Sequence, residues 1–297
     1  MAINCDQLEP GKDSKDRTPV LYIAEDMEAA ADWQFGFGGI AAFSRSSPEK
    51  TTGNEDSAAL IPIDPESGVL VVADGVGGMP TGGVASRITV ETLTANLLNF
   101  RSDQTLRDAI LDSIEQANRA VLERGSGAAT TVVVIEIQGN SIRPYHVGDS
   151  LILLTGQHGR LKLQNIPHSP TGYAVEAGLL DESDAIHHEE RNLVSNVVGD
   201  SEMRIEIGPS IKLAPRDTLV LASDGLSDNL YLEEIVNTVR VNPLPVVAAA
   251  LVKKALARMK NPVPGKPSHP DDLSFILFRR HPPPRKQRPR NGNPQRR

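Results

Sequence analysis

Apolar runs bounded by turn-forming residues recur along the chain and predict buried β-strands. The runs at 56–64, 68–74, 217–224 and 271–278 are short and rich in aliphatic and β-branched residues, which is typical of strands covered on both faces. Between residues 129 and 165, further runs are separated only by short turns. This stretch predicts three or four strands in an antiparallel meander, without a regular alternation of strands and helices.

Other segments carry the spacing of helices. Apolar residues recur at intervals of three or four over 83–100 and 106–121, which places them on one face of a helix. Two more helices are predicted over 230–238 and over the alanine-rich segment 246–259. The chain shows no internal repeat and no stretch that reads as an interdomain linker, so we expect one domain.

Both ends of the chain differ in character from this domain. Residues 1–34 are polar and irregular, and we assign them to an N-terminal extension. The domain then spans residues 35–280. Residues 281–297 form a tail rich in Pro and Arg without apolar anchors, and we expect this tail to be disordered.

Composition limits the class of protein. The chain has 297 residues, of which 39% are hydrophobic, enough for a packed core. A single cysteine, Cys5, excludes an intrachain disulfide. No apolar run approaches the length of a membrane span, and the N-terminus lacks the apolar core of a signal peptide. We therefore expect a cytoplasmic protein without membrane contact.

Charge is distributed unevenly between the body and the tail. Residues 279–297 contain 8 Arg or Lys and no acid, so the remaining residues hold 23 basic and 38 acidic side chains, a net charge of −15. Such an acidic body is a poor binder of nucleic acid and suits divalent cations. Two roles stay open for the tail: a solubilising end, or an electrostatic tether to an acidic partner or nucleic acid.

A glycine-rich loop follows the apolar run at 68–74, and its sequence departs from both of the common phosphate-binding loops. The dinucleotide fingerprint G-x-G-x-x-G fails because its third glycine is Pro80. The P-loop pattern fails because Gly83 and Val84 stand where lysine and a hydroxyl residue are required. Both motifs thus lack the residues that carry their chemistry.

Acidic residues, in contrast, recur where apolar runs begin or end. These corners are Glu55-Asp56, Asp74, Asp149, Asp224 and Asp271-Asp272. One such aspartate is usually a turn former or a helix N-cap. Five together point to a shared site, because carboxylates cannot share a buried edge unless protons or cations neutralise them. A purely oxygen ligand set favours Mg²⁺ or Mn²⁺.

The order of the acidic motifs resembles one family. N-E-D, then A-D-G-x-G-G, G-D-S, A-S-D-G-L and D-D-x-S follow one another as in the PPM/PP2C metal-dependent protein serine/threonine phosphatases of bacterial type. The resemblance extends over about residues 39–278. It implies an α+β fold of two stacked antiparallel sheets flanked by helices. It also implies hydrolysis of phosphoserine or phosphothreonine by a metal-activated water, without a covalent intermediate.

The resemblance assigns roles around a pair of Mn²⁺ or Mg²⁺ ions. Asp74 would bridge the two ions, and the Gly75 carbonyl and Glu55 would bind the second ion. Asp56 would orient a nearby water.

The remaining aspartates would belong to the first ion and to a further site. Asp224 and Asp271 match the ligands of the first ion, so that Asp74, Asp224, Asp271 and Asp56 form the expected catalytic set. Bacterial members often hold a third, weaker ion, and Asp149, Asp224 and Asp228 match its position.

Two positions depart from the family, and one segment matches it loosely. Thr51 stands where many members have a phosphate-binding arginine, and our hypothesis is that the adjacent Lys50 substitutes. Val76 stands where the better-known eukaryotic members have a histidine general acid, so we assign no general acid. Residues 165–200 occupy the place of the family's mobile flap, and we expect them to shape substrate access.

Three functions remain open from the sequence. The first is an active phosphatase acting on phosphoproteins, among them, by family analogy, the targets of a serine/threonine kinase. The second is a weakly active or inactive regulator that binds phosphoproteins on the same fold. The third is a hydrolase of other phosphoesters on an unrelated fold, against which the motif order argues.

Overall fold

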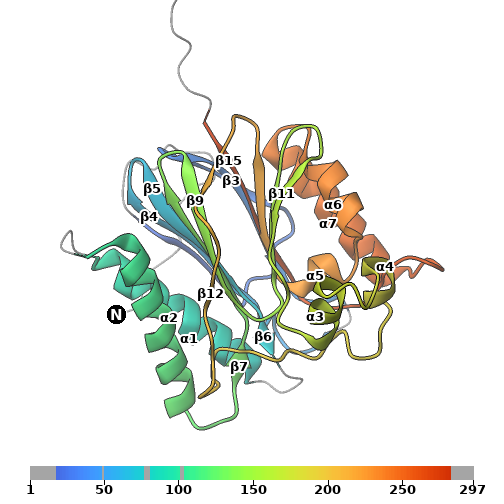
Figure 1. Cartoon of the computed structure of the whole chain (residues 1–297), viewed down its shortest axis with the longest axis horizontal. Coiled ribbons are helices and arrows are strands. Elements are labelled where there is room, and N and C mark those ends of the chain that lie inside the picture. Colours follow the sequence, from blue (N-terminus) through green and yellow to red (C-terminus); the bar gives the residue numbers. More distant parts are fainter. Residues whose placement is uncertain (1–17, 49, 77–80, 101–103, 282–297) are drawn as a thin grey trace, which may run out of the picture.

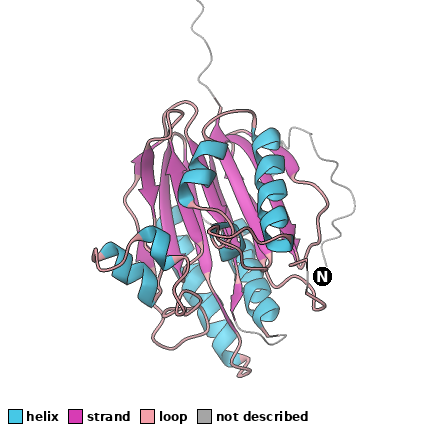
Figure 2. Cartoon of the chain, turned by 90° about the vertical axis from the view of Figure 1, so that its right-hand side faces the viewer, coloured by secondary structure: helices cyan, strands magenta, loops and turns pink. Residues whose placement is uncertain are grey.

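The computed structural model describes residues 18–48, 50–76, 81–100 and 104–281. Cys5, the centre of the glycine-rich loop (77–80) and the basic tail from residue 282 onward lie outside the described residues. Two antiparallel β-sheets stack face to face, and helices cover both outer faces (Figures 1 and 2). The predicted α+β sandwich is confirmed.

The first sheet is built around strands from the middle of the chain. Its order is β1 (Val20–Ile23), β4 (Ser57–Asp64), β5 (Ser67–Ala73), β8 (Val132–Gln138), β9 (Ser141–Val147) and β12 (Glu206–Ile207), with β13 (Ile211–Lys212) also paired to β9. Helices α1 (Gly82–Leu98) and α2 (Leu106–Glu123) pack on its outer face (Figure 1).

The second sheet combines both ends of the domain. Its order is β11 (Leu161–Gln164), β10 (Leu151–Thr155), β14 (Thr218–Ala222), β15 (Leu273–Arg280), β3 (Gly38–Arg45) and β2 (Ala31–Phe35). Helices α6 (Leu232–Val239) and α7 (Leu244–Lys260) cover it from outside. A small pair, β6 (Gly75–Val76) and β7 (Ala129–Thr130), lies at the edge of the sandwich.

The alternation of side chains along the strands creates three layers of core. In β5, Leu70 and Val72 pack between the sheets, whereas Val69 and Val71 pack under α1 and α2. All seven residues of this strand are buried. A strand covered on both faces is apolar at every position, which explains the continuous apolar runs of the sequence.

The structure corrects two expectations about chain organisation. Strand β1 and four of the five residues of β2 lie within the predicted extension 1–34 and pair with β4 and β3, so the sheets include residues from Val20 onward. The predicted meander is divided, because β8 and β9 belong to the first sheet and β10 and β11 to the second. The turn at Gly148, with φ +102°, carries the chain from one sheet to the other.

Three short helices lie near the cavity described below. They are α3 (Pro170–Glu176) and α4 (Glu182–Ala185), both within the flap segment (residues 165–200), and α5 (Asp224–Ser227), which directly follows β14. Among the described residues, no helix is both long and apolar enough to cross a membrane.

The close approach of α5 to the last strand yields a prediction about stability. A Cβ at Gly225 would lie 1.9 Å from the backbone carbonyl oxygen of Asp272. We therefore expect Gly225→Ala to push α5 off β15 and to lower the free energy of unfolding by about 1–3 kcal/mol or more. The matched control is Gly53→Ala, since a Cβ at Gly53 meets no atom within 4 Å. Thermal unfolding of both variants would decide, and equal melting temperatures would contradict the prediction.

Candidate active site

The acidic corners of the sequence meet at one end of the sandwich. Asp74 follows β5 and Asp224 follows β14, whereas Glu55, Asp149 and Asp271 precede β4, β10 and β15. Because neighbouring strands are antiparallel, the end of one strand lies beside the start of the next, and the register confirms this for Ala73 of β5 opposite Ser57 of β4. Loops distant in sequence therefore converge.

These loops enclose a cavity of about 570 Å³. Seven of the nine residues proposed from the sequence line it: Lys50, Glu55, Asp74, Gly75, Asp149, Asp224 and Asp271. His269 and Asp272 also line the cavity, and so does Val76. Asp56 and Asp228 are not among its lining residues.

Hydrogen bonds fix the Asp74 backbone and link its carboxylate to the start of α5. The Asp74 carbonyl accepts hydrogen bonds from Thr131 N (2.8 Å) and Thr130 Oγ1 (2.6 Å). The backbone N–H of Asp224, at the start of α5, points to Asp74 Oδ2 at 3.4 Å. The first turn of α5 thus presents a donor to Asp74 while its own carboxylate enters the same cavity.

Burial makes these carboxylates costly to ionise. It raises the pKa of Asp74 and of Asp224 well above the ordinary value, and neighbouring aspartates raise both further. Burial also raises the pKa of Asp149 to about 7, with Asp228 adding to the effect. The pKa of Asp271 is raised by burial as well. Such a set of charges is stable only with bound protons or cations.

The residues present fit a hard divalent cation. Asp224 Oδ1 is buried, and none of the described residues offers it a hydrogen bond. Gly75 lies so close to the neighbouring backbone that a Cβ would meet the Gly82 carbonyl carbon at 2.4 Å and the Glu55 carbonyl oxygen at 2.9 Å. The donor set consists of oxygen atoms only, which is the set that Mg²⁺ and Mn²⁺ prefer.

Asp56 lies behind the cavity and not in it. Its side chain is 1% exposed, and its Oδ2 accepts a hydrogen bond from Ser223 Oγ at 2.8 Å. Its Oδ1 has no hydrogen-bond partner among the described residues. Burial raises the pKa of Asp56, and the nearby Asp272 raises it further.

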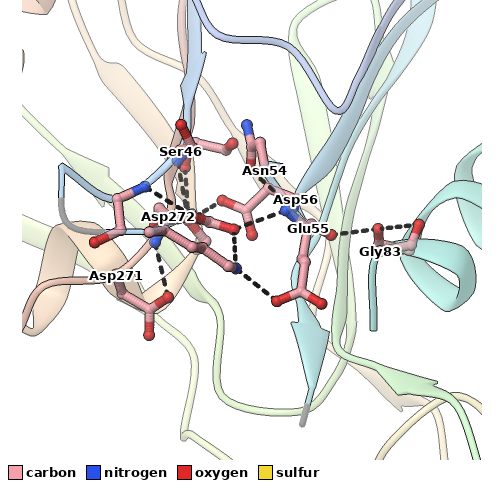
Figure 3. A network of polar contacts seen from close by, with 12 residues as sticks. Ser46, Asn54, Glu55, Asp56, Gly83, Asp271 and Asp272 are labelled. Carbon is pink, nitrogen blue, oxygen red and sulfur yellow. Dashed lines mark hydrogen bonds and ion pairs between the residues drawn. The ribbon is translucent and has the colours of Figure 1, made fainter. Parts of the chain in front are cut away.

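Asp272 connects the loops of this network, and the sequence did not single it out as a site residue (Figure 3). Its Oδ1 accepts from Ser47 N at 2.8 Å, and its Oδ2 accepts from Glu55 N at 2.7 Å and from Lys50 Nζ at 2.7 Å. One buried carboxylate, just before β15, therefore holds both ends of the connection between β3 and β4. Two adjacent aspartates precede the strand, and the sequence does not tell which one faces inward.

Lys50 lies in the cavity, and its ammonium is directed at two carboxylates. Lys50 Nζ is 2.5 Å from Glu55 Oε2 and 2.7 Å from Asp272 Oδ2. Burial alone would lower the pKa of Lys50, but hydrogen bonds to Asp272 and Glu55 outweigh burial and raise it. Lys50 is therefore a permanent positive charge in an otherwise acidic cavity.

Asp228 faces the flap segment and a neighbouring groove of about 790 Å³. Its carboxylate pairs with the Arg191 guanidinium at 3.1 Å, an interaction that the sequence did not indicate. Burial raises the pKa of Asp228, and Arg191 offsets part of this effect. Asp149 and Asp224 line both the groove and the cavity, so a cation bound by all three aspartates would compete with Arg191.

Comparison with known proteins places this arrangement in a family. The sequence model of protein phosphatase 2C matches residues 45–259. The chain belongs to the protein phosphatase 2C family. It is thus a phosphoprotein phosphatase of the serine/threonine class by descent, in a family that depends on metal ions.

Similar proteins come from several bacteria. A putative protein phosphatase 2C-type protein of Streptococcus pyogenes is 30% identical over 198 residues, which cover 63% of this chain and 79% of that protein. The structure of the S. agalactiae serine/threonine phosphatase superimposes with a TM-score of 0.71 at 27% identity, covering 82% of this chain and 99% of that chain. The catalytic domain of the phosphatase PstP, solved with two manganese ions, shares the fold with a TM-score of 0.65 at 22% identity, covering 88% of this chain and 99% of its own.

The raised pKa values predict how the metal-free protein responds to pH. An unfolded aspartate has a pKa of about 3.9, so the folded cavity binds more protons and its contribution to stability falls as pH rises from about 4 through 7. With a chelator present, we expect Asp74→Asn to raise the melting temperature at pH 7.5 by about 5 °C and by clearly less at pH 5.

The control for this measurement is Glu115→Gln, on the exposed face of α2. Scanning fluorimetry at both pH values gives the result, and Mn²⁺ should stabilise the wild type at pH 7.5 but Asp74→Asn much less. An Asp74→Asn protein that melts below the wild type at pH 7.5 would show that the buried charges are not the destabilising feature.

Proposed function

We propose that the protein is an active, metal-dependent phosphatase that hydrolyses phosphoserine and phosphothreonine in proteins at the cavity. The observation that carries this proposal is the convergence of Glu55, Asp74, Asp224 and Asp271 from four separate loops on one cavity. A structural role alone would not require so many buried carboxylates, since each one costs folding free energy.

The residues divide naturally between two Mn²⁺ or Mg²⁺ ions. Asp74 would be shared between them, Glu55 and the Gly75 carbonyl would hold one ion, and Asp224 and Asp271 would hold the other. When bound, such ions supply an activated water and offset the negative charge of the phosphoryl group.

A third ion would use residues at the border between the cavity and the groove. Asp149, Asp224 and Asp228 are the residues proposed for it. Asp228 can bind this ion only if its ion pair with Arg191 breaks. We therefore expect the third ion to bind more weakly than the first two.

The remaining residues of the cavity bind and orient. Lys50 is the candidate for binding the phosphate oxygens, since it is the cation whose side chain lines the cavity beside Glu55. Asp272 holds the Lys50 ammonium and the Glu55 backbone together. Asp56 directly follows Glu55, and its hydrogen bond from Ser223 ties this loop to the end of β14. Because its side chain lies behind the cavity, Asp56 would orient a water only indirectly, by positioning the residues around it.

The substrates are phosphoproteins, and two further partners are proposed. A serine/threonine kinase whose targets this enzyme dephosphorylates follows from the family resemblance. An acidic partner for the tail follows from the six basic residues of 281–297.

A second function competes with catalysis, namely binding of phosphoproteins without turnover. It is favoured by Thr51, which stands in place of the arginine of many members, and by Val76, which stands in place of the histidine of the better-known eukaryotic members. It is also favoured by Lys50, whose ammonium is already engaged by two carboxylates.

Phosphate release separates the two functions. With Mn²⁺ or Mg²⁺, we expect turnover of a phosphothreonine peptide and of a small aryl phosphate, and none with a chelator. Asp74→Asn should lose at least ~100-fold in kcat/KM, because the metal ions supply several kcal/mol of transition-state stabilisation. Glu115→Gln should remain active. A folded wild type that binds Mn²⁺ yet turns over neither substrate would establish the binding function instead.

Two substitutions test whether Lys50 binds the phosphate: one removes its positive charge, and the other keeps the charge but changes the shape of the cation. Lys50→Met should reduce kcat/KM for the phosphopeptide ~10–100-fold, since a charge-assisted hydrogen bond to phosphate is lost. Lys50→Arg should retain or exceed wild-type activity, because a guanidinium binds two phosphate oxygens at once. Steady-state kinetics of the three proteins give the answer, and unchanged kcat and KM in Lys50→Met would remove Lys50 from phosphate binding.

A further inference from the structure

His168 joins the two ends of the flap segment to the turn that precedes Asp149. It is 4% exposed and lies two residues before α3. Its backbone N–H donates to the Gly148 carbonyl at 3.0 Å, and its carbonyl accepts from Ser195 N (2.8 Å) and Ser195 Oγ (2.9 Å). The start of the flap segment is thereby fixed to its end and to the crossing between the sheets.

The hydrogen bonds around the His168 ring determine its tautomer. Nδ1 faces two donors, the Gly148 N–H at 3.0 Å and Asn196 Nδ2 at 2.8 Å. The orientation of the Asn196 amide is fixed, because its Oδ1 accepts from Arg204 N and its Nδ2 donates to the Arg204 carbonyl. Nδ1 must therefore accept, and the ring proton resides on Nε2, which donates to Glu206 Oε2 at 3.1 Å.

This tautomer argues against a metal ion at the same place. His146, His168 and Glu206 each offer a ligand atom, and these atoms lie within 4.8 Å of one another. A neutral imidazole that binds a metal through Nε2 carries its proton on Nδ1 and donates it to an acceptor. At His168 that proton would point at the Gly148 N–H. His146 Nε2 is also engaged, at 3.0 Å from the Ile166 carbonyl.

Two aromatic rings stack on the His168 ring. The ring of His146, on β9, stacks on His168 with centroids 4.4 Å apart, and Tyr173 of α3 stacks at 6.3 Å. Burial, with His168 adding to it, lowers the pKa of His146 to about 4. The His146 ring that stacks on His168 is therefore neutral at physiological pH.

The turn that His168 holds carries Asp149 into the cavity. On its other side, the turn packs against Thr131, since a Cβ at Gly148 would lie 2.5 Å from Thr131 Cβ. The hydroxyl of Ser150, the residue after Asp149, is 2.6 Å from Thr131 Oγ1. The Asp149 backbone is thus fixed between Thr131 and the His168 ring.

We propose that His168 is a positioning residue whose Nδ1 orients the turn bearing Asp149 and couples that carboxylate to the placement of the flap segment. The proposal rests on the proposed function only in assigning Asp149 to a cation site. It predicts that the acceptor at Nδ1 matters for the cavity, whereas the donor at Nε2 serves only the contact with Glu206.

Two substitutions of His168 distinguish the role of Nδ1 from the role of Nε2. His168→Asn keeps an acceptor near Nδ1 and loses the donor, whereas His168→Gln keeps a donor near Nε2 and loses the acceptor. We expect His168→Gln to weaken the lowest-affinity Mn²⁺ site ~10–100-fold, the effect usual for residues that orient a ligand. Its flap amides over 170–196 should also exchange hydrogen faster. His168→Asn and the control Glu206→Gln, which retains an acceptor, should stay close to wild type in both measurements.

Calorimetric Mn²⁺ titration and hydrogen exchange do not require turnover, so they test His168 even if the wild type proves inactive. Loss of turnover in the wild type alone would count against the proposed function and not against this inference. Equal behaviour of His168→Asn and His168→Gln, whether both wild-type or both impaired, would overturn the positioning role. So would a saturable Zn²⁺ site that survives Asp74→Asn and disappears in Glu206→Gln.

Discussion

The concentration of carboxylates in a low-dielectric edge is the constraint on which the rest of this structure depends. Asp74, Asp224, Asp149 and Asp271 face one another with raised pKa values, a state that opposes folding unless cations or protons join it. Two stacked sheets with fully buried central strands provide the rigid frame that keeps these charges together. The packing of the sandwich thereby stabilises an electrostatic arrangement that no single loop could hold.

Hydrogen-bond donors and cations from neighbouring loops complete this balance. Backbone N–H groups of Asp224 and Glu55 point at carboxylates, and Lys50 and Arg191 supply two positive charges. Glu55 and Lys50 come from the connection between β3 and β4, Asp224 from α5 and Arg191 from the flap segment. The flap segment therefore takes part in the electrostatics of the neighbouring groove through Arg191, and it lines the cavity through Asn192 and Val194.

Most elements of the fold were predictable because burial leaves a local pattern. The aliphatic run of β5 and the helical spacing of α1 and α2 agree with the structure. Strand β2 was not foreseen, since only Trp33 and Phe35 of its five residues are buried and its pairing partner β3 decides its conformation. The division of the meander between two sheets was also hidden, because periodicity reports burial and not which sheet a strand joins.

The residues of the site were likewise predictable where they leave a local pattern in the sequence, and not where their role depends on a distant partner. Most of the predicted carboxylates line the cavity because each stands beside an apolar run in a family motif. Asp272 stands in one of these motifs but was given no role, and Arg191 was not noticed. Their roles arise from pairings with Lys50 and Asp228, far away in sequence, and an isolated Asp or Arg gives no signal of such a partner. Lys50 was identified by position, but its engagement by two carboxylates depends on the fold alone.

The Lys50 bridge has a consequence for any anion that enters the cavity. The Lys50 ammonium pairs with Glu55 and with Asp272, and this bridge links the loops before β4 and β15. An anion that approaches Lys50 must therefore compete with two carboxylates already bound to its ammonium. Whatever takes over one of these carboxylates frees the ammonium, so the charge offered to an anion depends on what else occupies the cavity.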